Sequence, residues 1–205
     1  GVIAEETLWS CTACSACVEV CPLGVDPLEL IIDMRRHLVG AGAVRGPAAT
    51  TLEKLGRSGN PWGLPADGRM DWAEGLQVPT VDDQPDFDVL YWVGCAAAYD
   101  RRTQKIARAV VELLTRAEVN FAVLGPEERC SGDFARRMGD EFLFQELATG
   151  NIATLDSHGL ASLSPRRQII THCPHCLNSL VNDYPQFGGH YEVLHHSQYL
   201  AALID

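Results

Sequence analysis

The sequence lacks three features that would each assign it to a broad class of proteins. No apolar run reaches the roughly 18 residues that a membrane-spanning helix needs, and no stretch has the pattern of a signal peptide. Basic residues are not in excess, because 16 Lys and Arg stand against 27 Asp and Glu and the formal net charge is -11. We therefore expect no nucleic-acid partner. Nothing in the sequence resembles a hydrolase triad or a phosphate-binding loop.

What the sequence does contain is an ordinary globular composition with an unusual use of cysteine. Apolar residues make up 46% of the 205 residues and charged residues 21%, as in soluble globular proteins. This length allows one sizeable core with a smaller segment attached. Without a signal peptide, the eight cysteines point to a reducing compartment, where thiolates bind metal and do not pair as disulfides. We therefore expect a cytoplasmic, metal-binding protein.

The most specific pattern is a cysteine run near the start of the chain, Cys11-Thr-Ala-Cys14-Ser-Ala-Cys17-Val-Glu-Val-Cys21-Pro22. Its spacing is C-x2-C-x2-C-x3-C-P, in which thiolates of bacterial ferredoxins hold a [4Fe-4S] cluster. Zinc sites normally present two cysteine pairs separated by a longer loop, and a disulfide framework needs no such regularity. We predict that these four cysteines bind a [4Fe-4S] cluster.

The ligand set of that cluster has two possible arrangements. In two-cluster ferredoxins the fourth cysteine of each run binds the other cluster. Cys21 would then serve a cluster whose remaining ligands lie elsewhere, and Cys11, Cys14 and Cys17 would need a fourth thiolate from outside the sequence. The alternative is a single site that uses all four cysteines. Because the chain begins at Gly1 with no methionine, we expect it to be part of a longer protein.

Residue patterns divide the chain into three parts. Residues 1–39 hold the ferredoxin-type segment and a helix that begins at Asp26-Pro27, a capping residue followed by proline at the first helical position. Residues 40–86 are rich in Gly, Pro and Asp, and we interpret them as a linker with short helices and little core of its own. Residues 87–205 form the second domain.

Strands and helices alternate in that second domain. Four apolar runs have the length and composition of strands, at residues 87–93, 119–124, 168–171 and 191–194. Helical patterns follow each of them, including one helix over residues 135–149 with Phe142 available to the core, and one that carries Leu177 to Tyr184. Four alternations predict an α/β fold with a mainly parallel sheet covered by helices.

The remaining four cysteines all follow strands of this sheet. Cys95 comes after the first, Cys130 shortly after the second, and Cys173 and Cys176 after the third. Ligand sites in open α/β sheets lie outside the carboxyl ends of the strands. We therefore predict that the four cysteines converge on one metal centre. The alternative is scattered buried cysteines, since free cysteine is a common core residue.

The order of these cysteines resembles a known family. Cys95, then Cys130-Ser131-Gly132, then Cys173-Pro174-His175-Cys176 are similar to the cysteine-rich CCG domain of heterodisulfide reductases and related iron-sulfur oxidoreductase subunits. Two further stretches, Gly59-Asn60-Pro61-Trp62-Gly63 and Tyr184-Pro185-Gln186-Phe187-Gly188-Gly189, resemble the branch that passes electrons from electron-transfer flavoprotein to quinone. Members of that branch carry membrane helices, a second ferredoxin motif and a second cysteine-rich repeat.

The resemblance implies an electron-transfer subunit that relays electrons from an electron-transfer flavoprotein or flavin dehydrogenase toward a membrane quinone. It also implies a location at the cytoplasmic membrane through partners or missing segments. Ser131 departs from the family, because heterodisulfide-reducing members have a second cysteine there. Four thiolates suit a [4Fe-4S] cluster or zinc, so the metal of this second site stays open.

Three other functions remain as alternatives. The chain could be heterodisulfide reductase-like, it could be the iron-sulfur subunit of a 2-hydroxy acid or glycerol phosphate dehydrogenase, or it could be a zinc-stabilised interaction scaffold.

Several histidines and arginines accompany the predicted centre. His172, His175, His195 and His196 fall near the same sheet edge, where they could tune a cluster by hydrogen bonding or be ordinary loop residues. Arg136 and Arg137 could balance an anionic cluster or be solvated.

Overall fold

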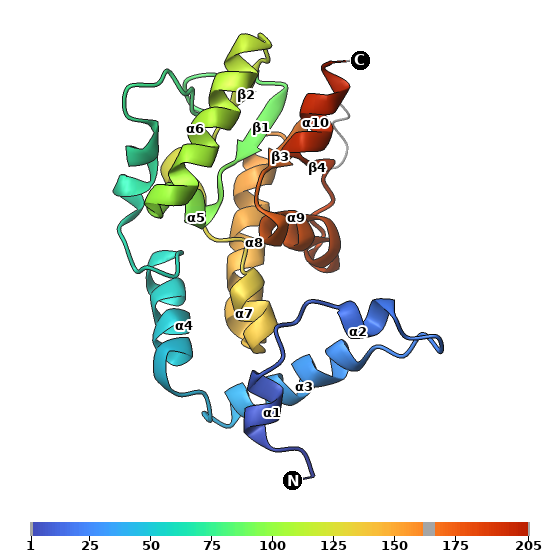
Figure 1. Ribbon diagram of the computed structural model, residues 1–205. Helices are drawn as coiled ribbons and strands as arrows, with labels where there is room; N and C mark the ends of the chain where they lie inside the picture. Colours follow the sequence, from blue (N-terminus) through green and yellow to red (C-terminus); the bar gives the residue numbers. More distant parts are fainter. Residues whose placement is uncertain (1, 162–166, 205) are drawn as a thin grey trace.

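A four-stranded sheet organises the computed structural model, which describes residues 2–161 and 167–204 (Figure 1). All its pairings are parallel and the strand order is β2-β1-β3-β4. The strands are β1 (Val89–Trp92), β2 (Phe121–Ala122), β3 (Gln168–Thr171) and β4 (Val193–His195). This confirms the predicted α/β class with a parallel sheet, although β2 is much shorter than the predicted strand.

Strand β1 separates two hydrophobic cores, because successive side chains of a strand point to opposite faces. Leu90 and Trp92 pack into one core with helix α8 (Glu141–Ser157), whereas Val89 and Tyr91 pack into the other with α6 (Arg101–Arg116). All four side chains are buried, as expected for a parallel strand covered on both faces. Two short helices follow strands of the sheet in the chain: α5 (Gly94–Tyr99) comes after β1, and η2 (Gly125–Glu127) comes after β2.

The helix predicted over residues 135–149 is in fact two helices, α7 (Asp133–Met138) and α8. Gly139 ends α7 in the left-handed conformation at φ 84°, and the Asp140 side chain caps α8 by accepting from the Leu143 amide. The prediction that Phe142 faces the core is wrong, since its side chain is 87% exposed. The glycine break sets a new helix axis and turns that position outward.

The helix predicted to carry Leu177 to Tyr184 is likewise divided. It comprises α9 (Pro174–Asn178), the π-helical turn η3 (Ser179–Asp183) and the 3-10 turn η4 (Tyr184–Phe187), and α10 (His196–Ala202) closes the described chain. Leu180 and Tyr184 are buried. A π-helical turn changes the periodicity on which the prediction of one continuous helix relied.

The first part of the chain is helical and lies beside α7 in Figure 1. It contains α1 (Glu5–Trp9), α2 (Ala16–Glu19) and α3 (Pro27–Gly40). Asp26 caps α3 as predicted, because its side chain accepts hydrogen bonds from the amides of Leu28 and Glu29. Helix α3 approaches the end of α7 closely at Gly139, where a Cβ atom would lie 2.5 Å from the backbone nitrogen of Arg36.

Residues 40–86 pack more closely than their composition suggests. They form α4 (Gly46–Ser58) and η1 (Ala66–Ala73), and a parallel bridge pairs Thr80 with Val123 beside β2. Leu52 and Leu55 enter one core of the sheet and Trp72 enters the other. These side chains enter the cores of the sheet, so the assignment of residues 40–86 as a linker with little core of its own stays a prediction.

No helix within residues 2–161 and 167–204 combines the length and apolarity needed to cross a membrane.

Candidate metal centres

Four cysteines meet at the carboxyl edge of the sheet, as the topology dictates. Cys95 is the second residue of α5, directly after β1, and its sulfur lies 3.7 Å from that of Cys130. Cys173 and Cys176 stand at the start of α9, after β3. A Cβ atom on Gly94 would be 3.4 Å from the Cys176 sulfur and 3.8 Å from the Cys173 Cβ. The β1 loop thus lies against the Cys173–Cys176 turn.

The four thiols interact in two pairs, and in each pair one thiol has a lowered pKa and the other a raised pKa. A hydrogen bond from Cys95 lowers the pKa of Cys130, and the same contact, with burial, raises the pKa of Cys95. A hydrogen bond from Cys176 lowers the pKa of Cys173 to about 6, while that contact and burial raise the pKa of Cys176. Each pair therefore favours one thiolate, and thiolate is the form that binds metal.

The donor chemistry of these pairs fits an all-thiolate metal centre. Both a [4Fe-4S] cluster and a structural zinc ion take four cysteine thiolates. The 3.7 Å separation of the Cys95 and Cys130 sulfurs is close to the distance of about 3.8 Å between two thiolates on a tetrahedral zinc with Zn–S bonds of about 2.3 Å. Across residues 2–161 and 167–204, no three His, Cys, Asp or Glu side chains stand close enough to share a metal ion.

A buried ion pair lies behind Cys95, and no sequence pattern indicates it. Arg69 of η1 contacts Glu128, and the two side chains are 3% and 1% exposed. The Glu128 carboxylate also accepts from the amides of Val93, at 2.9 Å, and Gly94, at 2.8 Å. It thereby holds the turn that leads into Cys95, while the positive charge of Arg69 opposes the rise in the Cys95 pKa that the Cys130 contact causes.

The histidines near this edge fall into two groups. His172 shares a 2.7 Å hydrogen bond with the Tyr91 hydroxyl, and its ring lies 6.3 Å from that of His196, which in turn lies 4.2 Å from His195. Burial, followed by the charges of His196 and His195, lowers the pKa of His172 to about 4. His175 instead contacts Asp133 at 2.8 Å. Their role in tuning a cluster stays a prediction.

The Cys11–Cys21 loop is built differently, from local backbone geometry. Ala13 and Ser15, on either side of Cys14, have φ values of 54° and 61°. This left-handed conformation costs about 1–2 kcal/mol at each non-glycine residue. Turns that alternate in this way point successive amides to one side and create concave sites for anions, including iron-sulfur clusters.

Backbone amides of the loop are directed at its sulfur atoms. The Ala13 amide donates to the Cys11 sulfur at 3.4 Å, and the Val25 amide donates to the Cys21 sulfur at 3.3 Å. Amide hydrogen bonds, chiefly from Ala16 and Leu23, lower the pKa of Cys14 and Cys21 respectively. The loop therefore favours thiolate at these positions, as a cluster ligand requires.

Comparisons with known proteins agree with the cysteine pattern. The family described as CCG, cysteine-rich domain, matches residues 89–181, which contain Cys95, Cys130, Cys173 and Cys176. No solved structure gives a significant match.

Named relatives match nearly the whole chain. It is 39% identical to the EtfAB:quinone oxidoreductase of Syntrophomonas wolfei, with 99% of this chain and 28% of that protein covered. It is 41% identical to the probable iron-sulfur-binding oxidoreductase FadF of Bacillus subtilis, with 99% and 29% covered. It is 28% identical to one subunit of the dihydromethanophenazine:CoB–CoM heterodisulfide reductase of Methanosarcina barkeri, with 98% and 48% covered. The chain thus spans less than a third of the two bacterial relatives and about half of the archaeal one.

Proposed function

Because residues 89–181 match the CCG cysteine-rich domain family, we propose that this chain is the part of an iron-sulfur oxidoreductase that relays electrons toward quinone. Its relatives are named as oxidoreductases or oxidoreductase subunits. In the proposal, Cys11, Cys14, Cys17 and Cys21 supply thiolates to a [4Fe-4S] centre at the exposed loop. Cys95, Cys130, Cys173 and Cys176 supply thiolates to the second centre, at the sheet edge.

One observation carries the proposal more than any other. Cysteines from three strand ends, separated by up to 81 residues in sequence, lie at one edge of the sheet, within the residues that the CCG family model matches. This convergence supports a common metal centre over a scattered set of core cysteines.

The residues of the chain have defined tasks in this relay. A cluster, when bound, supplies one-electron chemistry. The cysteines hold it, the amides of the loop donate to sulfur, and the buried Arg69 places a positive charge behind Cys95. The protein sets potentials through such charges, hydrogen bonds and burial. No side chain of this chain has to transfer a proton.

Reduction of a disulfide is disfavoured by one residue. Ser131 is buried, and it occupies the position at which the resemblance implies a second cysteine in heterodisulfide-reducing members. The site therefore offers four thiolates, as a plain [4Fe-4S] cluster or zinc requires.

Structural zinc in the second centre is a second candidate, which the 3.7 Å separation of Cys95 and Cys130 favours. In that case electrons pass only through the Cys11–Cys21 centre, and the sheet edge is a stabilising site.

The proposed partners follow from the relatives and stay proposals for this chain. The name EtfAB:quinone oxidoreductase supports an electron-transfer flavoprotein or flavin dehydrogenase as the donor and quinone as the acceptor. A cytoplasmic position beside the membrane, reached through other segments or subunits, is consistent with that acceptor.

Metal analysis of the full-length protein tests the proposal. Anaerobically purified protein should be brown, with about four irons and matching sulfide at each [4Fe-4S] site. Cys173→Ser should remove one cluster signal from the electron paramagnetic resonance spectrum and leave the loop signal in place. A colourless protein that holds only zinc would overturn the relay. Turnover with a heterodisulfide but not with a quinone analogue would replace it with disulfide reduction.

A further inference from the structure

A series of side-chain contacts connects the two cysteine centres through helix α7. Asp133, the first residue of α7 and 7% exposed, uses both carboxylate oxygens. Its Oδ1 accepts from Arg137 Nε at 2.8 Å, and its Oδ2 lies 2.8 Å from Nδ1 of His175, which stands between Cys173 and Cys176. Arg137 also donates through Nη1 to the Ala13 carbonyl, between Cys11 and Cys14. One carboxylate thus links a turn of each centre.

A second guanidinium holds the same loop against α7. Arg35 of α3 is buried and donates to the carbonyls of Leu8 and Cys11, each at 2.6 Å, and to the Arg137 carbonyl at 2.7 Å. Two arginines therefore connect the loop to α7, Arg35 through the Arg137 carbonyl and Arg137 through its own side chain. Only one of them, Arg137, is paired with a carboxylate that also reaches the sheet-edge centre.

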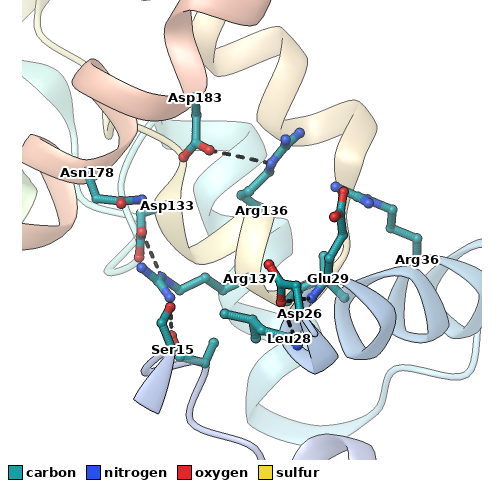
Figure 2. Close-up of a pocket in the computed structure, with 12 residues that line it drawn as sticks. Ser15, Asp26, Leu28, Glu29, Arg36, Asp133, Arg136, Arg137, Asn178 and Asp183 are labelled. Atoms are coloured by element: carbon teal, nitrogen blue, oxygen red, sulfur yellow. Dashed lines mark hydrogen bonds and ion pairs between the residues drawn. The ribbon is translucent and has the colours of Figure 1, made fainter. Parts of the chain in front are cut away.

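Figure 2 places this linkage on the wall of a cavity of about 210 Å³ between the loop and α7. Arg137 extends from α7 with Asp133 on one side and the loop at Ser15 on the other. A second carboxylate, Asp183, lies across the same cavity and contacts Arg136 at 3.8 Å. Asp183 does not contact either cysteine turn through Arg137, so it provides a matched comparison.

We propose that Asp133 is a positioning residue for both cysteine centres: its carboxylate holds Arg137 on the Cys11–Cys14 turn and His175 on the Cys173–Cys176 turn. This rests on the proposed relay function. The linkage fixes how far apart the centres are, and it places a cation, Arg137, with its balancing anion beside the loop centre. Charge-assisted hydrogen bonds of this kind have defined geometry and are stronger than neutral ones.

The charges make the proposal testable through the sign of a potential shift. Reduction of a cluster adds negative charge, so a nearby cation favours the reduced form and a nearby anion disfavours it. In the full-length protein, Arg137→Gln should lower the midpoint potential of the loop centre, and Asp133→Asn, which releases Arg137 from the Cys11–Cys14 turn, should lower it as well. Asp183→Asn removes an anion without releasing Arg137, so it should not lower the potential. Potentiometric titration followed by electron paramagnetic resonance gives the three values.

The signs decide the outcome. If Asp133 contributes only its charge and does not hold Arg137 on the loop, Asp133→Asn should instead raise the potential, and the proposal is overturned. Equal potentials in all variants would also overturn the proposal.

Amide hydrogen exchange can test the linkage without a bound cluster, so the linkage and the relay can fail independently. Should the loop show no iron-sulfur signal, the relay fails, and hydrogen exchange still tests the linkage. Amides of residues 11–17 should exchange about tenfold faster in Arg137→Gln, the effect of losing one charge-assisted hydrogen bond, and be unchanged in Asp183→Asn. Equal exchange in all three proteins contradicts the linkage.

Discussion

The two cysteine centres are built in contrasting ways within one chain. The Cys11–Cys21 loop takes all its cysteines from one short stretch, with Cys14 and Cys17 exposed, and shapes itself through left-handed backbone and amide–sulfur contacts. The sheet-edge centre assembles cysteines from three strand ends, with Cys130 and Cys176 buried in a core. Substitutions in the Cys11–Cys21 loop should therefore have little effect on the stability of the fold. Substitutions at the sheet-edge centre should also disturb the hydrophobic core, because two of its cysteines are part of that core.

The largest expected effect comes from the ion pair behind the sheet-edge centre. Arg69→Met leaves the Glu128 carboxylate buried without its cation, and breaking a buried pair in this way costs about 3–5 kcal/mol. Denaturant unfolding of the metal-free protein should show this loss. The control is Glu146→Gln, which breaks the 3.6 Å surface contact with Arg129 and should cost no more than about 1 kcal/mol. Equal losses of unfolding free energy in the two variants would mean that the buried ion pair contributes no more to stability than a surface contact does.

The next effect tests how the loop region is docked on α7. In Gly139→Ala the new Cβ would meet the backbone of α3, 2.5 Å from the Arg36 nitrogen. Overpacking costs about 1–3 kcal/mol, in addition to about 1–2 kcal/mol for the left-handed conformation. Gly42→Ala is the matched control, since Gly42 has φ 65° and nothing within 4 Å of its Cβ position.

Limited proteolysis should therefore cut the α1 to α3 region faster in Gly139→Ala than in Gly42→Ala. Similar rates would mean that the close approach of α3 and α7 does not hold the two regions together.

A pair of cysteine variants compares the centres directly. Cys176→Ser places a hydroxyl in a site that is 3% exposed, and burying such a group costs about 1–3 kcal/mol. Cys14→Ser lies on the exposed loop and should leave the unfolding free energy of the metal-free protein unchanged. Each variant should still lose the metal of its own centre. If Cys14→Ser destabilises the metal-free protein as much as Cys176→Ser, the loop is part of the folding unit.

Sequence patterns located the elements whose signals are local. The strand predicted at residues 168–171 coincides with β3, and the Asp26 cap begins α3. The placement of cysteines after successive strands also predicted their meeting at one edge, because parallel strands share a carboxyl end. That these cysteines bind metal stays a prediction.

Contacts between distant residues could not be predicted in the same way. Arg69 and Glu128 are 59 positions apart, and each lies in a polar stretch that has the pattern of a surface loop. In the Asp133 linkage, Asp133 and His175 are 42 positions apart, and Arg137 and Ala13 are 124 positions apart. No periodicity or spacing encodes such pairs, since only the folded topology brings them together. Gly139 was missed for a different reason, because a glycine inside an apolar pattern is compatible with a helix as well as with its end.

The smallest expected effect comes from helix caps, one in each region. Asp100 caps α6, whose apolar face fills a core of the sheet, and its contacts with the amide and hydroxyl of Thr103 hold the pKa of its carboxyl below the usual value of 3.8. A pKa lowered by folding contributes stability above the unfolded value, and this contribution is lost as the pH falls through the folded value. The melting temperature of Asp100→Ala should therefore lie below that of the wild type at pH 7, and the difference should shrink below about pH 4.

Asp26→Ala removes the corresponding cap of α3, a helix with Arg35 as its single buried residue. Because α3 contributes so little to either core, this variant should speed hydrogen exchange in the loop region while the global melting temperature changes less than in Asp100→Ala. A larger drop in melting temperature for Asp26→Ala would mean that the loop region, although its cysteine site is local, melts as one unit with the sheet.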